Sequence, residues 1–385
     1  MRQRSQFNGP RLTDKLEEFL RTRPETPFLA MDGDVVLSKY LTMRACFSSA
    51  TIYYAVKANP VPDLVALLAA VGAGFDISSR HELDLCLSLN VAAEQLSYGN
   101  PIKKADDIAY AYKHGVRCFA FDSQTELEKL AVHAPGAGVM CRLLTSGEYA
   151  DWPLSRKFGC DVEMAGELLL ESRNLGLDPL GVMFHVGSQQ TDPQQWQKPI
   201  REAASIVHRL AAQGIQLTTV NLGGGFPARY RDKIPPLCCY ARAIAHAVGE
   251  LFDLSKINLV LEPGRSLVAE AGVIETEVVL VARKSRQDER RWVYLDVGKF
   301  GGLAETLNES IKYRFRTARD GEIGPVVLAG PPCDSADILY ERNVCALPLD
   351  LACGDRIEIL SAGAYTSSYA SVGFNGFPPL RTYWL

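Results

Sequence analysis

The feature that most constrains the fold of this sequence is a regular alternation of strand-like and helix-like segments over residues 51–264. Short runs rich in β-branched and aromatic residues alternate with longer segments whose apolar residues recur at helical spacing. The eight expected strands are TIYYAV (51–56), GFDIS (74–78), QLSYG (95–99), CFAFD (118–122), GVMCRLL (138–144), GVMFHVG (181–187), TTVNLG (218–223) and NLVLEPG (258–264). The seven expected helices between them span residues 61–71, 81–89, 105–114, 124–134, 165–175, 200–213 and 240–252.

Seven helices that join eight strands are the pattern of an α/β chain that closes into a (β/α)8 barrel of the TIM type. An open doubly wound sheet has the same local pattern and usually fewer strands, so it remains the alternative. We therefore expect a barrel over residues 28–264, with its active site at the carboxyl ends of the strands.

The pattern changes after residue 264 to strand-like runs separated by Gly, Pro and charged turns, with a single helical stretch at residues 302–313. This indicates a separate β-rich domain of residues 1–27 and 265–385. The segment PFLAMDG (27–33) is strand-like and is expected to pair with that domain. The basic cluster at residues 283–291 contains two acids and lies between strands, so we interpret it as a solvated hairpin turn. The expected strands are residues 273–282, 291–298, 325–331 and 355–363.

Composition and charge exclude several classes of partner. The formal net charge is −4, which provides no basic field for nucleic acid or anionic lipid. The longest apolar run, residues 64–75, is too short to cross a bilayer. The ten cysteines include no C-x-x-C pair and no metal-binding motif is present, so we expect no metal and a reduced, cytoplasmic protein. A small-molecule substrate is the expected partner.

Polar residues follow the expected strands at the points where those strands end. Lys57 follows the first strand and Asp76 lies within the second. Because the carboxyl ends of barrel strands converge, these side chains are expected to meet at one mouth. The later strands contribute His185, Ser188, Gly223, Gly224, Gly225, Glu262, Gly264 and Arg265.

Each of these residues also has a plain structural interpretation. Lys57 is consistent with a solvated strand end, and the three glycines are consistent with a simple turn. His185 is consistent with a hydrogen-bonded core histidine, and Arg265 with the ion-pair partner of a buried Glu262.

One cofactor would satisfy all of these groups together. A lysine amine held in a partly desolvated site can bond an aldehyde, and bare glycine amides with Ser188 and Arg265 can surround a phosphate. Glu262 would pair with a protonated ring nitrogen, and His185 would stack on the ring. An aldehyde with a phosphate and a pyridine ring is pyridoxal phosphate.

The sequence also resembles a known family. The motifs YAVKANP, FDISS, HVGSQ, GGGFP, LEPGRS, GPPCDSADILYE and GAYTSSYASVGFNGF occur in this order over essentially the whole chain. They resemble those of the fold-type III pyridoxal-phosphate-dependent decarboxylases of basic amino acids, and among these the bacterial ornithine decarboxylases.

The resemblance implies roles for individual residues. It implies Lys57 as the Schiff-base lysine and Cys333 as the acid that returns a proton to Cα. For the substrate it implies Asp334, Glu309 and Phe374, with Asn308 as the alternative to Glu309. It further implies a homodimer in which Cys333 and Asp334 reach the partner's cofactor. For the cofactor it implies Asp76, His185, Ser188, Gly224, Gly225, Glu262, Gly264, Arg265 and Tyr365.

The expected reaction is decarboxylation of L-ornithine to putrescine and CO2, a step of polyamine biosynthesis. A carboxylate on the ring nitrogen keeps the ring a strong electron sink, which favours decarboxylation over racemisation. Lysine differs from ornithine by one methylene, worth about 1–3 kcal/mol, so a lysine or dual-specificity enzyme is the alternative. Diaminopimelate decarboxylase is the next alternative, although its motif usually has glutamate where this chain has Asp334. A non-catalytic regulatory homologue would lack Lys57 or Cys333, and both are present.

Overall fold

The computed structural model describes residues 12–152 and 156–385, which form two compact units. One, the barrel unit, comprises Leu37–Pro227 and Ile234–Ser266. The other, the sheet unit, comprises Met1–Val36, Ala228–Lys233 and Leu267–Leu385, of which residues 1–11 lie outside the described part. The barrel unit therefore begins after residue 36, whereas the expected barrel range began at residue 28.

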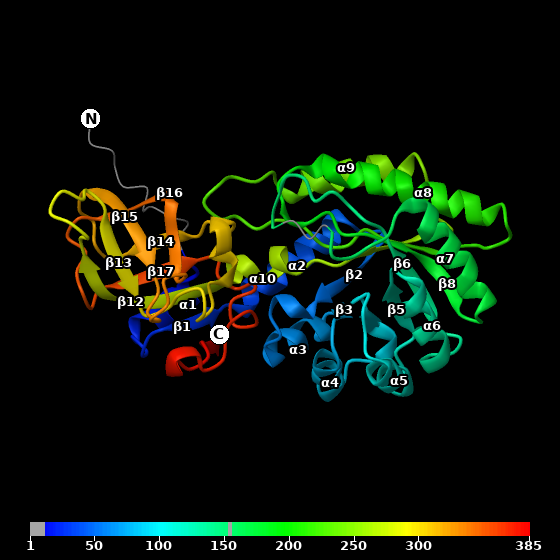
Figure 1. The fold of residues 1–385 in the computed structure, drawn as a ribbon, viewed down its shortest axis with the longest axis horizontal. Helices are drawn as coiled ribbons and strands as arrows, with labels where there is room; N and C mark the ends of the chain where they lie inside the picture. Colours follow the sequence, from blue (N-terminus) through cyan, green and yellow to red (C-terminus); the bar gives the residue numbers. More distant parts are fainter. Residues whose placement is uncertain (1–11, 153–155) are drawn as a thin grey trace. The chain divides into compact units, whose positions relative to one another are not determined.

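The barrel unit contains a closed barrel of eight parallel strands in the order β10-β11-β2-β3-β4-β5-β6-β8 (Figure 1). Every strand predicted for residues 51–264 is confirmed. Most barrel strands are buried along nearly their whole length, as expected when helices cover the outside and side chains fill the inside. The strands are β2 (Ala50–Ala55), β3 (Gly74–Ile77), β4 (Leu96–Tyr98), β5 (Cys118–Phe121), β6 (Gly138–Arg142), β8 (Asp178–Met183), β10 (Thr219–Asn221) and β11 (Asn258–Leu261).

The seven helices predicted between the barrel strands are confirmed, whereas two further helices, over residues 33–46 and 265–268, were not predicted. Local sequence explains where several begin: Ser79 accepts a hydrogen bond from the Glu82 amide at the start of α4, and Asp161 accepts one from Met164 at the start of α7. The helices are α2 (Gly33–Cys46), α3 (Pro62–Ala70), α4 (Arg80–Ser88), α5 (Ala105–Lys113), α6 (Gln124–His133), α7 (Val162–Asn174), α8 (Gln197–Ala211), α9 (Leu237–Gly249) and α10 (Arg265–Val268). In the part of the chain that the structure describes, none of the helices has the length and apolar character needed to cross a membrane.

The sheet unit is built on strands in the order β14-β17-β12-β13-β15-β16. The early strand β1 (Phe28–Met31) pairs with β12 and with the last strand, which confirms the predicted pairing of residues 27–33 with this domain. The turn between β12 and β13 is the predicted hairpin. The other strands are β12 (Gly272–Ala282), β13 (Arg291–Leu295), β14 (Arg314–Thr317), β15 (Ile323–Ala329), β16 (Ile338–Pro348), β17 (Arg356–Leu360) and β18 (Arg381–Trp384), and α1 (Asp14–Arg21) packs on β1 and β12.

The helix predicted for residues 302–313 is wrong. This segment forms only a short 3₁₀ turn at Ala304–Glu309, and Asn308 has a left-handed backbone with φ +55°. The Glu309 carboxylate explains the difference, because it accepts hydrogen bonds from amides of β16 and draws the segment onto that strand. Tertiary contacts therefore override the helical pattern.

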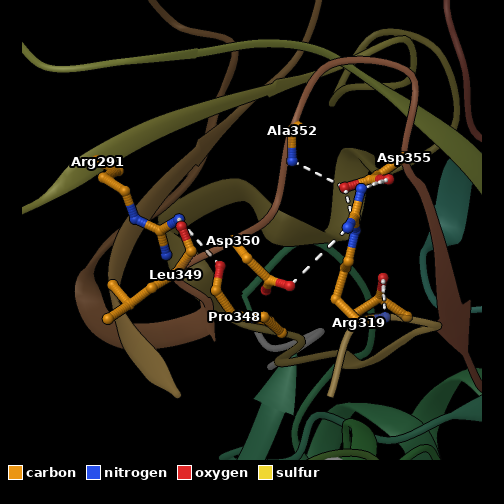
Figure 2. Close-up of polar contacts among 8 residues, drawn as sticks. Arg291, Arg319, Pro348, Leu349, Asp350, Ala352 and Asp355 are labelled. Atoms are coloured by element: carbon orange, nitrogen blue, oxygen red, sulfur yellow. Dashed lines mark hydrogen bonds and ion pairs between the residues drawn. The ribbon is translucent and has the colours of Figure 1, made fainter. Parts of the chain in front are cut away.

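Two arginines hold the turn between β16 and β17 (Figure 2). Arg319 makes two parallel hydrogen bonds to Asp355, with nitrogen–oxygen distances of 2.9 and 2.8 Å. Arg291 donates to the carbonyls of Pro348 and Leu349 at 2.9 and 3.2 Å. These contacts provide hydrogen-bond donors for backbone carbonyls at and just beyond the end of β16, and they give the turn a defined shape.

Candidate active site

A lysine and an aspartate meet at the mouth of the barrel. Strand β2 ends at Ala55, and the 3₁₀ turn that follows, Val56–Ala58, presents Lys57. The Lys57 Nζ lies 2.6 Å from Oδ2 of Asp76 on the neighbouring strand β3. The lysine side chain is 42% exposed and the aspartate 1%. The amine is therefore reachable from the mouth while its counter-ion is fixed in the wall.

A second carboxylate stands at the end of β11. Glu262 is buried, and its Oε1 accepts a hydrogen bond of 2.6 Å from the side-chain amide (Nδ2) of Asn221 at the end of β10. Burial, together with the negative charge of Asp76, raises the pKa of Glu262 above its ordinary value. A carboxyl group in such a place favours a cationic partner, because a positive charge would offset the cost of desolvating it.

The three glycines after β10 form a tight turn. Gly223 and Gly225 have φ of +66° and +98°, a conformation that other residues rarely adopt. A Cβ at Gly224 would lie 2.5 Å from the Glu262 carbonyl oxygen and 3.2 Å from His185 Nε2. The turn therefore requires glycine for its conformation and for its close approach to neighbouring groups.

Beside the turn lie a serine and an arginine. Arg265 is buried and donates from Nε and Nη2 to the Ser188 hydroxyl at 3.1 and 3.0 Å. Ser188 begins the short strand β9 (Ser188–Gln190), and the Gln190 amide of that strand donates to the Gly225 carbonyl at 2.9 Å. Gly264 immediately precedes Arg265, so glycine, hydroxyl and guanidinium groups cluster in one place.

His185 lies between these groups with a neutral ring. Desolvation, and then the positive charges of Arg142 and Lys57, lower the pKa of His185 well below its ordinary value. The Gly187 amide donates to Nδ1 at 3.0 Å, so Nδ1 is the acceptor and Nε2 carries the proton. A neutral imidazole of fixed orientation is suited to stacking on a planar ring.

The sequence interpretation missed two residues of this mouth. Asn221 holds Glu262, and Arg142 at the end of β6 interacts electrostatically with Glu262, Asp122 and Asp76. Both are the last residues of observed strands, but the predicted strands extended to residues 144 and 223, so neither residue was identified as a strand end. Glu82, a third residue that the sequence interpretation missed, interacts electrostatically with Lys57. Burial raises the pKa of Glu82 to about 7 despite a 2.6 Å hydrogen bond from the Ser78 amide.

The remaining predicted residues belong to the sheet unit. Cys333 and Asp334 lie in the exposed loop between β15 and β16, where the Cys333 amide donates to Asn375 Oδ1 at 3.0 Å. This bond brings the loop next to Phe374, whose ring centroid is 4.8 Å from that of Phe300. Tyr365 has a left-handed backbone with φ +54° in the segment after β17.

Glu309 has a different environment from the one expected of a substrate ligand. It is 7% exposed, and its two carboxylate oxygens accept hydrogen bonds from the backbone amides of residues 341–343 and from the Asn343 side chain. Burial alone would raise the pKa of Glu309, but these bonds outweigh it and lower the pKa to about 2. The carboxylate is thus engaged in holding its own segment on β16.

The barrel mouth fits a phosphorylated aldehyde with a basic ring. Lys57 is an accessible amine, and the three glycines offer backbone amides with no side chains of their own. The Oδ1 atom of Asp76 is buried and has no hydrogen-bond partner among the described residues, as expected of a group that binds a polar ligand. The structure therefore offers an amine, an anion cradle and a carboxylate at one site.

Comparison with known proteins decides the family. A family model described as the pyridoxal-binding domain of pyridoxal-dependent decarboxylases matches residues 34–269. A lysine/ornithine decarboxylase of Selenomonas ruminantium is 34% identical over 95% of this chain and 91% of its own length. The chain belongs to the fold-type III pyridoxal-phosphate-dependent decarboxylases of basic amino acids.

Further comparisons agree with this assignment. The mouse ornithine decarboxylase is 31% identical to this decarboxylase over 97% of the chain and 84% of its own length. A crystal structure of a Vibrio vulnificus lysine/ornithine decarboxylase complexed with putrescine superposes with a TM-score of 0.86 at 31% identity, covering 96% of this chain and 97% of the other. The decarboxylase is thus a carboxy-lyase that uses pyridoxal phosphate and acts on a basic amino acid.

Proposed function

We propose that this enzyme decarboxylates L-ornithine to putrescine and CO2. The observation that carries the proposal is the pair Cys333-Asp334, whose side chains are exposed together on one loop. Oδ1 of the Asp334 carboxylate accepts a hydrogen bond of 2.8 Å from the Ala336 backbone amide, which fixes the orientation of the carboxylate in the loop. A carboxylate beside the acid–base cysteine suits a substrate that ends in an ammonium group.

The cofactor is assigned to the barrel mouth. Lys57 is proposed to bond its aldehyde, and the amides of Gly224, Gly225 and Gly264 to surround its phosphate. When bound, pyridoxal phosphate supplies an electron sink for the negative charge left as CO2 departs. Ser188, Arg265 and Tyr365 are proposed to complete the phosphate site, with Asp76 beside the lysine.

The chain's own groups set the electronics of that site. Glu262, held by Asn221, is proposed to keep a proton on the cofactor's ring nitrogen, because a buried carboxylate gains a cationic partner there. His185 is neutral and oriented by the Gly187 amide, so it can stack on the ring without adding charge. The thiol of Cys333 is proposed to return a proton to Cα after CO2 leaves.

We infer a homodimer with shared active sites. Cys333, Asp334 and Phe374 lie on exposed loops of the sheet unit, as expected of groups that serve a second copy of the chain. The ten cysteines are free thiols, which supports a reducing compartment such as the cytoplasm. Glu309 is not assigned to the substrate, because β16 occupies its carboxylate.

The test is CO2 release by the holoenzyme from ornithine, lysine and diaminopimelate, compared as kcat/KM. Ornithine is expected to be preferred, and Asp334→Ala should lower kcat/KM for ornithine about 100-fold, since an unpaired desolvated ammonium costs about 3 kcal/mol. Asp320→Ala, at an exposed aspartate of the same unit, is the matched control. Preference for diaminopimelate would contradict the role of Asp334.

Lysine is the second candidate substrate. The similar proteins of Selenomonas and Vibrio are named lysine/ornithine decarboxylases, and one methylene changes binding by only about 1–3 kcal/mol. Preference for lysine in the same assay would show that the substrate pocket accommodates one more methylene than proposed. The proposed reaction would be unchanged.

A further inference from the structure

Two cysteines of the barrel unit lie in contact at the carboxyl end of β6. Cys141 is in β6, and Cys160 lies just before the Asp161 cap of α7. Their Sγ atoms are 3.6 Å apart, and the two residues are 0% and 7% exposed. Nothing in the proposed reaction uses either thiol.

Backbone contacts hold this pair together although its members are far apart in sequence. The Cys160 amide donates to the Arg142 carbonyl at 3.0 Å, and the Leu144 amide donates to the Cys160 carbonyl at 2.9 Å, which makes a parallel bridge between Cys160 and Leu143, the residue after β6. The Gly159 amide donates to Asp122 Oδ2 at 2.7 Å. Gly159 and Cys160 are therefore fixed beside the end of β6.

We propose that Cys141 and Cys160 are a redox-sensitive dithiol that closes to a disulfide when the protein meets peroxide. Cys160 is the more exposed thiol, and it would react first: its sulfur attacks hydrogen peroxide, the O–O bond breaks, water leaves and a sulfenic acid forms. The Cys141 sulfur then attacks the Cys160 sulfur, the S–S bond forms, the S–O bond breaks and a second water leaves. Two thiols and one peroxide thus give one disulfide and two waters.

Bond formation requires a small movement of Cys160. A disulfide needs a sulfur–sulfur distance of about 2.05 Å, shorter than the 3.6 Å contact. Cys141 is fixed in the closed barrel, whereas Cys160 lies outside the barrel strands and forms an isolated bridge to Leu143, so Cys160 is the residue that shifts. The shift would strain the hydrogen bond between Leu144 and Cys160 at the base of the segment.

The bond would tie Cys160 covalently to β6, the strand that residues 143–152 follow. These residues come directly after Arg142 of the barrel mouth and include β7 (Ala150–Trp152), which pairs with β9 at Ser188. Cross-linking the two ends of a chain segment reduces the conformations open to it. The disulfide form should therefore allow residues 143–152 fewer conformations than the dithiol form.

The test maps thiols in the wild-type holoenzyme after exposure to hydrogen peroxide. Remaining thiols are alkylated under denaturing conditions, and peptides are identified by mass spectrometry. A linked peptide joining Cys141 to Cys160, lost on treatment with dithiothreitol, is expected. Activity is not the readout, because the Cys333 thiol is exposed and is expected to be oxidised under the same conditions. Recovery of Cys141 and Cys160 as alkylated thiols, while Cys333 is oxidised, would overturn the proposal.

Variants and proteolysis complete the test. Cys141→Ser and Cys160→Ser should each abolish the linked peptide, whereas Cys86→Ser, at another buried cysteine of the same unit, should retain it. Limited proteolysis between residues 145 and 152 should be several-fold slower in the oxidised than in the reduced wild type. Equal cleavage rates after verified linkage would refute the effect on the segment.

Discussion

The Nζ atom of Lys57 lies 2.6 Å from Oδ2 of Asp76, and this ion pair joins the first two strands of the barrel at its mouth. The aspartate is buried, and no group in residues 12–152 or 156–385 forms a hydrogen bond with its Oδ1 atom. The pair therefore combines an accessible amine with a fixed negative charge that orients it.

The first prediction concerns the amine of this pair. Purified protein should be yellow, and Lys57→Ala should lose both the colour that survives dialysis and the turnover, because no amine remains to bond the aldehyde. Lys57→Arg should behave in the same way while retaining the charge opposite Asp76. Absorbance after dialysis and CO2 release are the measurements, and Lys113→Ala, at an exposed lysine of α5, is the control. A colourless wild type that pyridoxal phosphate cannot reconstitute would end the cofactor assignment.

The second prediction concerns the charge of Glu262. Glu262→Gln retains the oxygen that accepts from Asn221 but removes the charge proposed to hold the ring proton. We expect kcat to fall on the order of 100-fold, the size of effect found when one preorganised electrostatic contact is lost. The thermal unfolding midpoint should stay near that of Glu167→Gln, a change on the exposed face of α7. Turnover within a factor of a few of wild type would contradict the electronic role.

The third prediction concerns assembly. Lys57→Ala and Cys333→Ala proteins should each be inactive, but mixing them should restore activity, because a heterodimer contains one site with neither lesion. The measurement is CO2 release after subunit exchange verified by native mass spectrometry. Persistent inactivity in verified heterodimers would indicate that each site is completed within one chain.

The fourth prediction concerns Glu309 and pH. Hydrogen bonds from β16 lower the pKa of Glu309 from 4.5 to about 2, against the opposing effect of burial. A lowered carboxyl pKa contributes stability that is complete above pH 4.5 and is lost as the pH falls toward 2. Glu309→Gln should therefore lower the free energy of unfolding at pH 7 by about 3 kcal/mol. This gap between wild type and variant should narrow below pH 4.5, where Glu309 of the wild type becomes protonated.

Urea unfolding at several pH values measures this gap. The exposed neighbour Glu341→Gln is the matched control, and it should show no such narrowing. A gap for Glu309→Gln that stays constant from pH 7 to pH 3 would show that its hydrogen bonds do not favour the ionised form.

The sequence by itself determined the barrel and much of its mouth. Each strand carries a local signal, and parallel strands that close a barrel must bring their carboxyl ends together. Lys57, Asp76 and Glu262 could therefore be grouped before any contact was known. The positions of the barrel helices follow from local signals as well, such as the Ser79 cap of α4.

Only the tertiary structure decided how these side chains are partnered. The amide that holds Glu262 comes from Asn221, and the groups that hold Glu309 come from β16, in both cases across large separations in sequence. The helical pattern of residues 302–313 yields to those distant amides, because several hydrogen bonds to a buried carboxylate outweigh a weak helix preference. The contact between Cys141 and Cys160 has the same origin: it exists because a backbone bridge returns the chain to β6. Local periodicity specifies elements, whereas the partners of charged and polar groups depend on which elements the folded chain brings together.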